Sequence, residues 1–144
     1  MNDFVTSTEL VKELTYSTIT HNVKINATPV YSPIESEPHK HHYVWHYHIH
    51  IENNSPERLQ LLKRHWIIIS ANGHVKEVHG SGVLGVQPIL NPHEGFEYSS
   101  ETSLITPSGL MVGKYDMAKD DGSIIQVDVP AFSLDSPYSL ALKN

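Results

Sequence analysis

The stretch YVWHYHIHI at residues 43–51 decides the fold class, because apolar residues alternate with histidines from residue 45 onward. The odd positions carry aromatic and aliphatic residues, whereas the even positions carry Val44 and three histidines, His46, His48 and His50. Neighbouring residues of a β-strand point to opposite faces of the sheet. The alternation therefore predicts a strand with one buried face and one histidine-rich face.

Further short, β-prone stretches lie on both sides of this strand. A period-two pattern begins at Ser17, and the prolines between residues 29 and 38 break it. Asn72-Gly73 and Asp121-Gly122 are hairpin signals, and the first is predicted to form a type I′ turn. About seven strands without a convincing amphipathic helix predict an all-β, two-sheet sandwich, with a small barrel as the alternative. The remaining strands are expected at 59–70, 74–78, 86–90, 96–105, 110–118 and 124–132.

The length of 144 residues suits one domain with its own core. We expect a flexible N-terminal arm at residues 1–16, the sandwich at 17–135 and a loose C-terminal tail at 136–144. The chain has no cysteine, and its formal net charge of −6 argues against a nucleic-acid partner. Without a signal-like N-terminus or an apolar run of ~20 residues, we expect a cytoplasmic protein with no membrane partner.

Several motifs between Val44 and Leu134 carry a family resemblance. They are IHIEN at 49–53, RHW at 64–66, GSGVLG at 80–85, QP at 87–88, GFEY at 95–98, TPSG at 106–109 and DVPAFSL at 128–134. In this order they resemble the ApaG family, also called DUF525. The resemblance implies an immunoglobulin-like, fibronectin type III-like sandwich. The molecular role of the family is mostly unknown, and its bacterial members are linked to cobalt and magnesium resistance.

The resemblance also implies an interaction module. Related domains occur in larger eukaryotic proteins, among them an F-box substrate adaptor and a DNA polymerase partner. His46 and His48 stand where relatives usually carry other residues, so a role built on these two histidines is a local variation and not a family trait.

The stretch GSGVLG at residues 80–85 fits the pattern G-x-G-x-x-G. In dinucleotide sites such a loop opens a helix whose N-terminal amides hold the pyrophosphate, but here VQP follows and leads into a strand. We favour the interpretation that the glycines allow a tight turn with positive φ. The alternative is a small anion nest of backbone amides. Because the resemblance implies a pyrophosphate-binding role for this loop, Gly80, Gly82 and Gly85 are candidate ligand-binding residues.

His46, His48 and His50 form the candidate metal site. Same-face neighbours on a strand lie ~6.6 Å apart, so an adjacent pair could chelate a divalent ion such as zinc, cobalt or nickel. The outer two lie ~13 Å apart, so a third ligand has to come from elsewhere, such as His21, His79 or a carboxylate. The alternative is a solvated strand face with no metal, and no cofactor is expected.

The trio Arg64-His65-Trp66 is interpreted as structural. Trp66 is expected in the core, and Arg64 is expected to stack on an aromatic ring or to pair with Glu52 or Glu97. No nucleophile elbow and no H-E-x-x-H motif occurs in the sequence, so we predict that the protein is not an enzyme.

The sequence thus predicts a non-enzymatic binding module that recruits a protein partner through a sheet edge or an exposed loop, with an indirect link to metal resistance. The alternative is a binder of a small ligand or ion, with a pyrophosphate-bearing molecule at residues 80–85 or a divalent metal at residues 46–50. A hydrolase of phosphorylated compounds is the third hypothesis. A homodimer through edge-strand pairing is also compatible with this fold.

Overall fold

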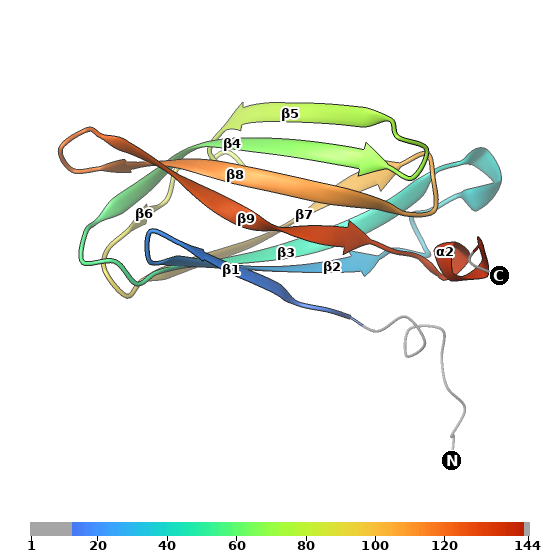
Figure 1. Ribbon diagram of the computed structural model, residues 1–144, viewed down its shortest axis with the longest axis horizontal. Helices are drawn as coiled ribbons and strands as arrows, with labels where there is room; N and C mark the ends of the chain where they lie inside the picture. The colour runs from blue at the N-terminus through green and yellow to red at the C-terminus, as the bar shows by residue number, and fades with distance from the viewer. Residues whose placement is uncertain (1–12, 143–144) are drawn as a thin grey trace, which may run out of the picture.

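Two antiparallel sheets face each other and form a β-sandwich (Figure 1). The computed structural model describes residues 13–142. One sheet has the order β1 (Tyr16–Thr20), β2 (Val23–Tyr31), β3 (Tyr43–Asn53) and β7 (Gly95–Leu104). The other has the order β5 (Val75–Ser81), β4 (Leu59–Ser70), β8 (Gly109–Lys119) and β9 (Ile124–Leu134), and the short β6 (Ile89–Leu90) also pairs with β4. The predicted all-β sandwich is confirmed.

The core lies between the sheets and is rich in aromatic rings. The odd residues of β3, from Tyr43 to Ile51, are all buried, as their alternation predicts. Trp66 of β4 is only 3% exposed, which confirms its expected place in the core. Its ring meets those of Tyr47 and Phe132 nearly edge-on, with centroids 5.5 and 6.1 Å away. Such edge-to-face packing is favoured by the ring quadrupoles and fixes how the two sheets stack.

The hairpin turns differ from the prediction. At Asn72-Gly73 only Gly73 has a positive φ, of 89°, and its amide donates to the carbonyl of Ser70 at 2.9 Å. A type I′ turn needs positive φ at both central residues, so that prediction is wrong; the loop instead has three residues and ends in a left-handed glycine. Positive φ at both positions of a two-residue turn between sequential strands occurs instead at His21-Asn22, between β1 and β2, with φ of 51° and 63°.

The expected break at Pro29 is also wrong, because β2 continues to Tyr31. β1 pairs with β2 only as far as Ala27, so Pro29 lies where β2 has a single strand neighbour, β3, within the part of the chain that the structure describes. A proline cannot donate a hydrogen bond to a ladder, and an edge position tolerates this. The proline-rich segment that follows contains a 3-10 turn, η1 (Pro38–Lys40).

Both predicted terminal segments include residues with regular secondary structure. The arm predicted at residues 1–16 lies outside the described residues as far as residue 12, and Tyr16 already belongs to β1. The tail from residue 136, expected to be loose, instead contains the short helix α2 (Pro137–Leu142), and Ser136 is buried. The indole Nε1 of Trp45 donates to the carbonyl of Asp135 at 2.8 Å and thereby anchors the segment to the core.

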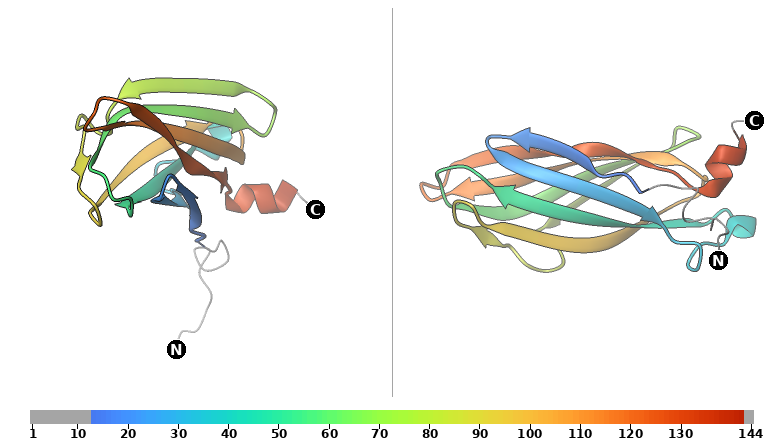
Figure 2. Two further views of the ribbon diagram at one scale, coloured as in Figure 1. Left: turned by 60° about the vertical axis from the view of Figure 1, so that its left-hand side comes forward. Right: turned by 90° about the horizontal axis from the view of Figure 1, so that it is seen from below.

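The two long sides of the sandwich differ. On one side β9 packs beside β1 and β2, and the amide of Asp128 donates to Oγ1 of Thr20 at 3.2 Å (Figure 2). On the other side β5 and β7 are the outer strands of their sheets, each with one strand neighbour within residues 13–142. The sandwich therefore has one closed and one open side. Across the described part of the chain, no helix has the length and hydrophobicity needed to cross a membrane.

Candidate functional site

The open side of the sandwich is hollowed along the gap between β5 and β7. One hollow of about 360 Å³ is lined by β3, β4, β5, β7 and β8 residues, including Lys76 and Thr102. A second hollow of about 280 Å³ continues it toward the loop after β5 and includes Leu84 and Gly85. Both hollows share four residues, Tyr47, Arg64, Trp66 and Ser100. We call this continuous depression the edge groove.

Arg64 lies where the two hollows meet. Its Nη1 donates to the carbonyl of Gly82 at 2.8 Å and to that of Ser81 at 3.1 Å. The pairing expected with Glu52 or Glu97 is wrong: Glu97 bonds to His48, and Glu52 bonds to the side chain of Asn54. Arg64 is held by backbone carbonyls, which carry no net charge, so its positive charge stays available at the groove surface.

Gly80 is what lets the guanidinium lie flat beside β5. A Cβ at residue 80 would lie 2.7 Å from three guanidinium atoms of Arg64, closer than any side chain can pack. This is a close-approach role, because the φ of Gly80 is not in the left-handed region. The first glycine of the motif is therefore explained by Arg64.

The other two glycines shape the turn after β5. Gly82 has a φ of 60°, its amide donates to the carbonyl of Leu62 at 2.7 Å, and a Cβ there would collide with the carbonyl of Val86. Val83 and Val86 exchange two backbone hydrogen bonds of 2.9 and 3.0 Å, and Gly85 has a φ of 78°. The short strand β6 follows instead of a helix. The amides of Gly82, Val83 and Val86 are already bonded, so the geometry agrees with the turn interpretation, and pyrophosphate binding stays a prediction.

Leu84 is the residue of this loop that sequence reasoning did not single out. It is 63% exposed and has a φ of 48°, in the left-handed region that leucine rarely adopts. The reciprocal bonds of Val83 and Val86 fix this conformation, so that an apolar side chain stands beside the edge groove. Strained residues of this kind concentrate at functional sites. The glycine spacing was the available signal, since a tight turn from Val83 to Val86 leaves the side chain of its central Leu84 outside.

Three buried tyrosines close to Arg64 carry no charge: Tyr47, Tyr98 and Tyr115. The hydroxyl groups of Tyr98 and Tyr115 are hydrogen bonded to each other, and burial raises the pKa of both well above the usual value. Burial also raises the pKa of Tyr47, at the junction of the two hollows. These hydroxyls stay protonated across the physiological range, so they can donate hydrogen bonds but do not neutralise Arg64.

The histidine face of β3 lies on the outside of its sheet. His46 contacts Glu35 and lies 3.9 Å from Glu101, whereas His48 bonds to Ser99 at 2.8 Å and to Glu97 at 2.9 Å. The bond from His46, followed by that from Ser32, lowers the pKa of Glu35. The histidines thus have separate partners and do not converge on one point.

Neither histidine proposed as a third ligand joins this face. His21 lies in the turn between β1 and β2, and His79 lies on β5 in the other sheet. His50 faces Gly95, whose added Cβ would lie 3.4 Å from the Nε2 of His50. Metal binding by His46, His48 and His50 stays a prediction. In the structure these three side chains lie next to Glu35, Glu97 and Gly95, respectively.

These features define a class of protein: a β-sandwich domain with one open, arginine-centred edge. The ApaG domain family matches residues 33–119. The chain is 48% identical over 122 residues to Protein ApaG of Brucella canis, a match that covers 85% of this chain and 94% of that protein. It is 50% identical over 124 residues to Protein ApaG of Parvibaculum lavamentivorans, covering 86% and 95%. The chain belongs to the ApaG family.

A solved structure shares the fold. The crystal structure described as an ApaA protein from Bordetella pertussis superposes with a TM-score of 0.78 at 38% sequence identity. The match covers 83% of this chain and 97% of that chain. The resemblance drawn from the sequence motifs is therefore confirmed, and so is the sandwich that it implied.

Proposed function

We propose that this ApaG domain is a non-enzymatic binding module that recruits a protein partner by holding an extended segment of it in the edge groove. The observation that carries the proposal is the position of Arg64, a guanidinium held by uncharged carbonyls where two hollows meet between two outer strands. A link to cobalt and magnesium resistance then acts through the partner.

The edge strands supply the first part of the recognition. Among the described strands, β5 and β7 each have one neighbour, so each offers backbone groups to an extended peptide, as in β-strand addition. Main-chain hydrogen bonds of this kind give affinity with little dependence on sequence, so the groove side chains have to provide the selectivity.

Arg64 and Leu84 define the chemistry of the partner segment. A guanidinium prefers a carboxylate, which it binds through two parallel hydrogen bonds. Leu84 adds an exposed apolar contact in the smaller hollow, whose lining also includes Arg64. The expected segment is therefore extended and carries an acidic residue close to an apolar one.

The test is a selection of phage-displayed random peptides on the folded domain, followed by synthesis and titration of the selected peptides. We expect an acidic residue next to an apolar residue to be enriched. Arg64→Gln and Leu84→Gly should each weaken binding at least tenfold. Arg58→Gln is the matched control, because Arg58 is an exposed arginine that pairs with Asp120 at 3.0 Å away from the groove.

Amide NMR shifts locate the binding site independently. Peptide-induced shifts confined to β5, β7 and residues 82–86 support the proposal. A selection that returns no binder, or binders whose affinity is unaffected by Arg64→Gln, contradicts it. A parallel titration with pyrophosphate addresses the alternative, since saturable shifts at residues 80–85 without any selected peptide would favour a small-ligand binder.

A further inference from the structure

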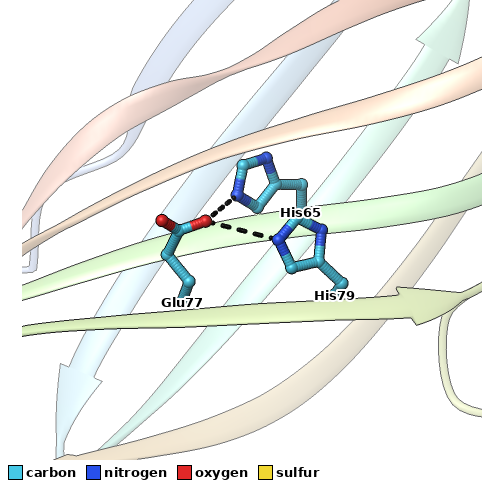
Figure 3. Close-up of side chains that lie close together, drawn as sticks. All are labelled: His65, Glu77 and His79. Atoms are coloured by element: carbon cyan, nitrogen blue, oxygen red, sulfur yellow. Dashed lines mark hydrogen bonds and ion pairs between the residues drawn. The ribbon is translucent and has the colours of Figure 1, made fainter.

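The outer face of the second sheet carries a cluster of two histidines and one glutamate (Figure 3). His65 of β4 lies directly opposite His79 of β5 in the antiparallel ladder. Their imidazole rings are stacked, with centroids 4.0 Å apart and planes 16° from parallel. Oε2 of Glu77 lies 2.9 Å from the Nε2 of His65 and 3.3 Å from the Nε2 of His79.

The three side chains are aimed at one point, as Figure 3 shows. Both imidazoles present the same ring nitrogen, Nε2, to the same carboxylate oxygen, and the donor atoms all lie within 4.8 Å of one another. Ligands of a zinc-like ion, bound at about 2.0–2.2 Å, stand about 3–4 Å apart around the metal. A small rotation of the exposed side chains therefore suffices to replace the shared hydrogen bonds with metal–ligand bonds.

We propose that His65, Glu77 and His79 form a binding site for one divalent transition-metal ion of the zinc class, with Nε2 of each imidazole and a carboxylate oxygen as ligands. Two imidazoles and one carboxylate are a ligand set used by zinc and its neighbours, whereas magnesium prefers oxygen ligands alone. Three protein ligands leave a fourth position open.

The surroundings indicate what occupies the open position and how tightly the ion is held. The cluster borders a hollow of about 450 Å³ whose lining includes Lys63, Lys114 and Asp116. Lys114 of β8 lies directly opposite His65 on the side away from His79, so its positive charge opposes a cation. We therefore expect moderate affinity, and the fourth position faces water or a small anion within the hollow.

This cluster is a better site than the histidine face of β3. The second grouping of possible ligands, Glu35, His46 and Glu101, offers one imidazole and two exposed carboxylates. Its single nitrogen ligand suits zinc-class ions less well than the two imidazoles of the His65 cluster. The cluster also lies on the opposite sheet from β3, so the two can be tested separately in the same molecule.

The experiment is a zinc chloride titration of the full chain in a buffer that does not chelate, followed by NMR of the histidine ring nitrogens. Eleven histidines make total stoichiometry uninformative, so binding is measured at each ring. We expect the Nε2 signals of His65 and His79 to shift together before those of the other histidines. His79→Gln and Glu77→Gln should each weaken zinc binding at least tenfold, whereas Lys114→Gln should strengthen it about threefold, because a screened neighbouring cation is removed.

The matched control is the double variant with His46→Gln and His48→Gln, which should change zinc affinity at the His65 ring less than twofold. All five altered residues have exposed side chains on sheet faces, and metal-free melting curves report whether a variant has kept its fold. The proposal is overturned if the rings of His46 and His48 respond first. It is equally overturned if folded His79→Gln and Glu77→Gln proteins bind zinc as tightly as the unaltered protein.

Discussion

Replacing Gly80 with alanine should have opposite effects on stability depending on whether Arg64 is present. In the unaltered protein the new Cβ would lie 2.7 Å from the guanidinium, which has to leave its two carbonyl partners. Hydrogen bonds from a charged donor contribute about 1.5–3 kcal/mol when buried, and we take about 1 kcal/mol each for this partly exposed side chain. Alanine in a strand gains about 0.5–1 kcal/mol over glycine. The net expectation is a loss of about 1–1.5 kcal/mol.

In an Arg64→Ala background the clash is absent, so Gly80→Ala should stabilise the protein by about 0.5–1 kcal/mol. The coupling energy between the two sites is then about 2 kcal/mol. Urea unfolding of the four proteins, monitored by tryptophan fluorescence, measures each free energy of unfolding. Equal effects of Gly80→Ala in the two backgrounds, within about 0.5 kcal/mol, would refute the assignment of this glycine to the packing of Arg64.

Three further predictions concern the core, the loop after β5 and the last hairpin. Gly113→Ala places a Cβ against the ring of buried Trp66 and should destabilise the protein by about 1–3 kcal/mol in urea unfolding; an unchanged midpoint would contradict this packing. Leu84→Gly should stabilise the protein by about 0.5–1 kcal/mol by relieving its left-handed backbone, and a loss of stability would argue against strain there. Hydrogen bonds from the hydroxyl and amide of Ser123 lower the pKa of Asp121. Its stabilisation of the turn is therefore present above the unfolded pKa of about 3.9 and is lost as pH falls through the lower folded pKa. Ser123→Ala should raise that pKa in a carboxyl NMR titration, and an unchanged pKa would refute the cause.

The arrangement of the strands could be predicted well, because it depends on a strong local pattern. The alternation from Tyr43 to Ile51 identified both faces of β3, and Trp66 was expected in the core. The pattern is less informative where the ladder is irregular. The pairing of β4 with β8 shifts register between Leu61 and Lys63, so Leu61 is buried on the same side as Trp66, although strict alternation places them on opposite faces.

The candidate metal cluster could not be predicted, because it depends on one residue of register. A two-residue turn at Asn72-Gly73 would pair His65 with Gly80, whereas the three-residue loop pairs it with His79. The sequence therefore suggested His79 only as a third metal ligand for the histidines of β3, which belong to the other sheet. The edge groove was missed for a different reason: Arg64 was expected to stack on an aromatic ring or to pair with a carboxylate. The carbonyls that hold it belong to a loop whose conformation the glycine pattern does not specify.

The glycine loop and α2 lie at opposite ends of the sandwich (Figure 1). The indole of Trp45 ties the chain to the core at Asp135, just before that helix. A surface, fluorophore or second domain coupled beyond α2 would therefore lie at the end of the sandwich opposite the glycine loop. The domain can thus be mounted by its helical end as an oriented probe, with the edge groove facing the solution in which a partner is sought.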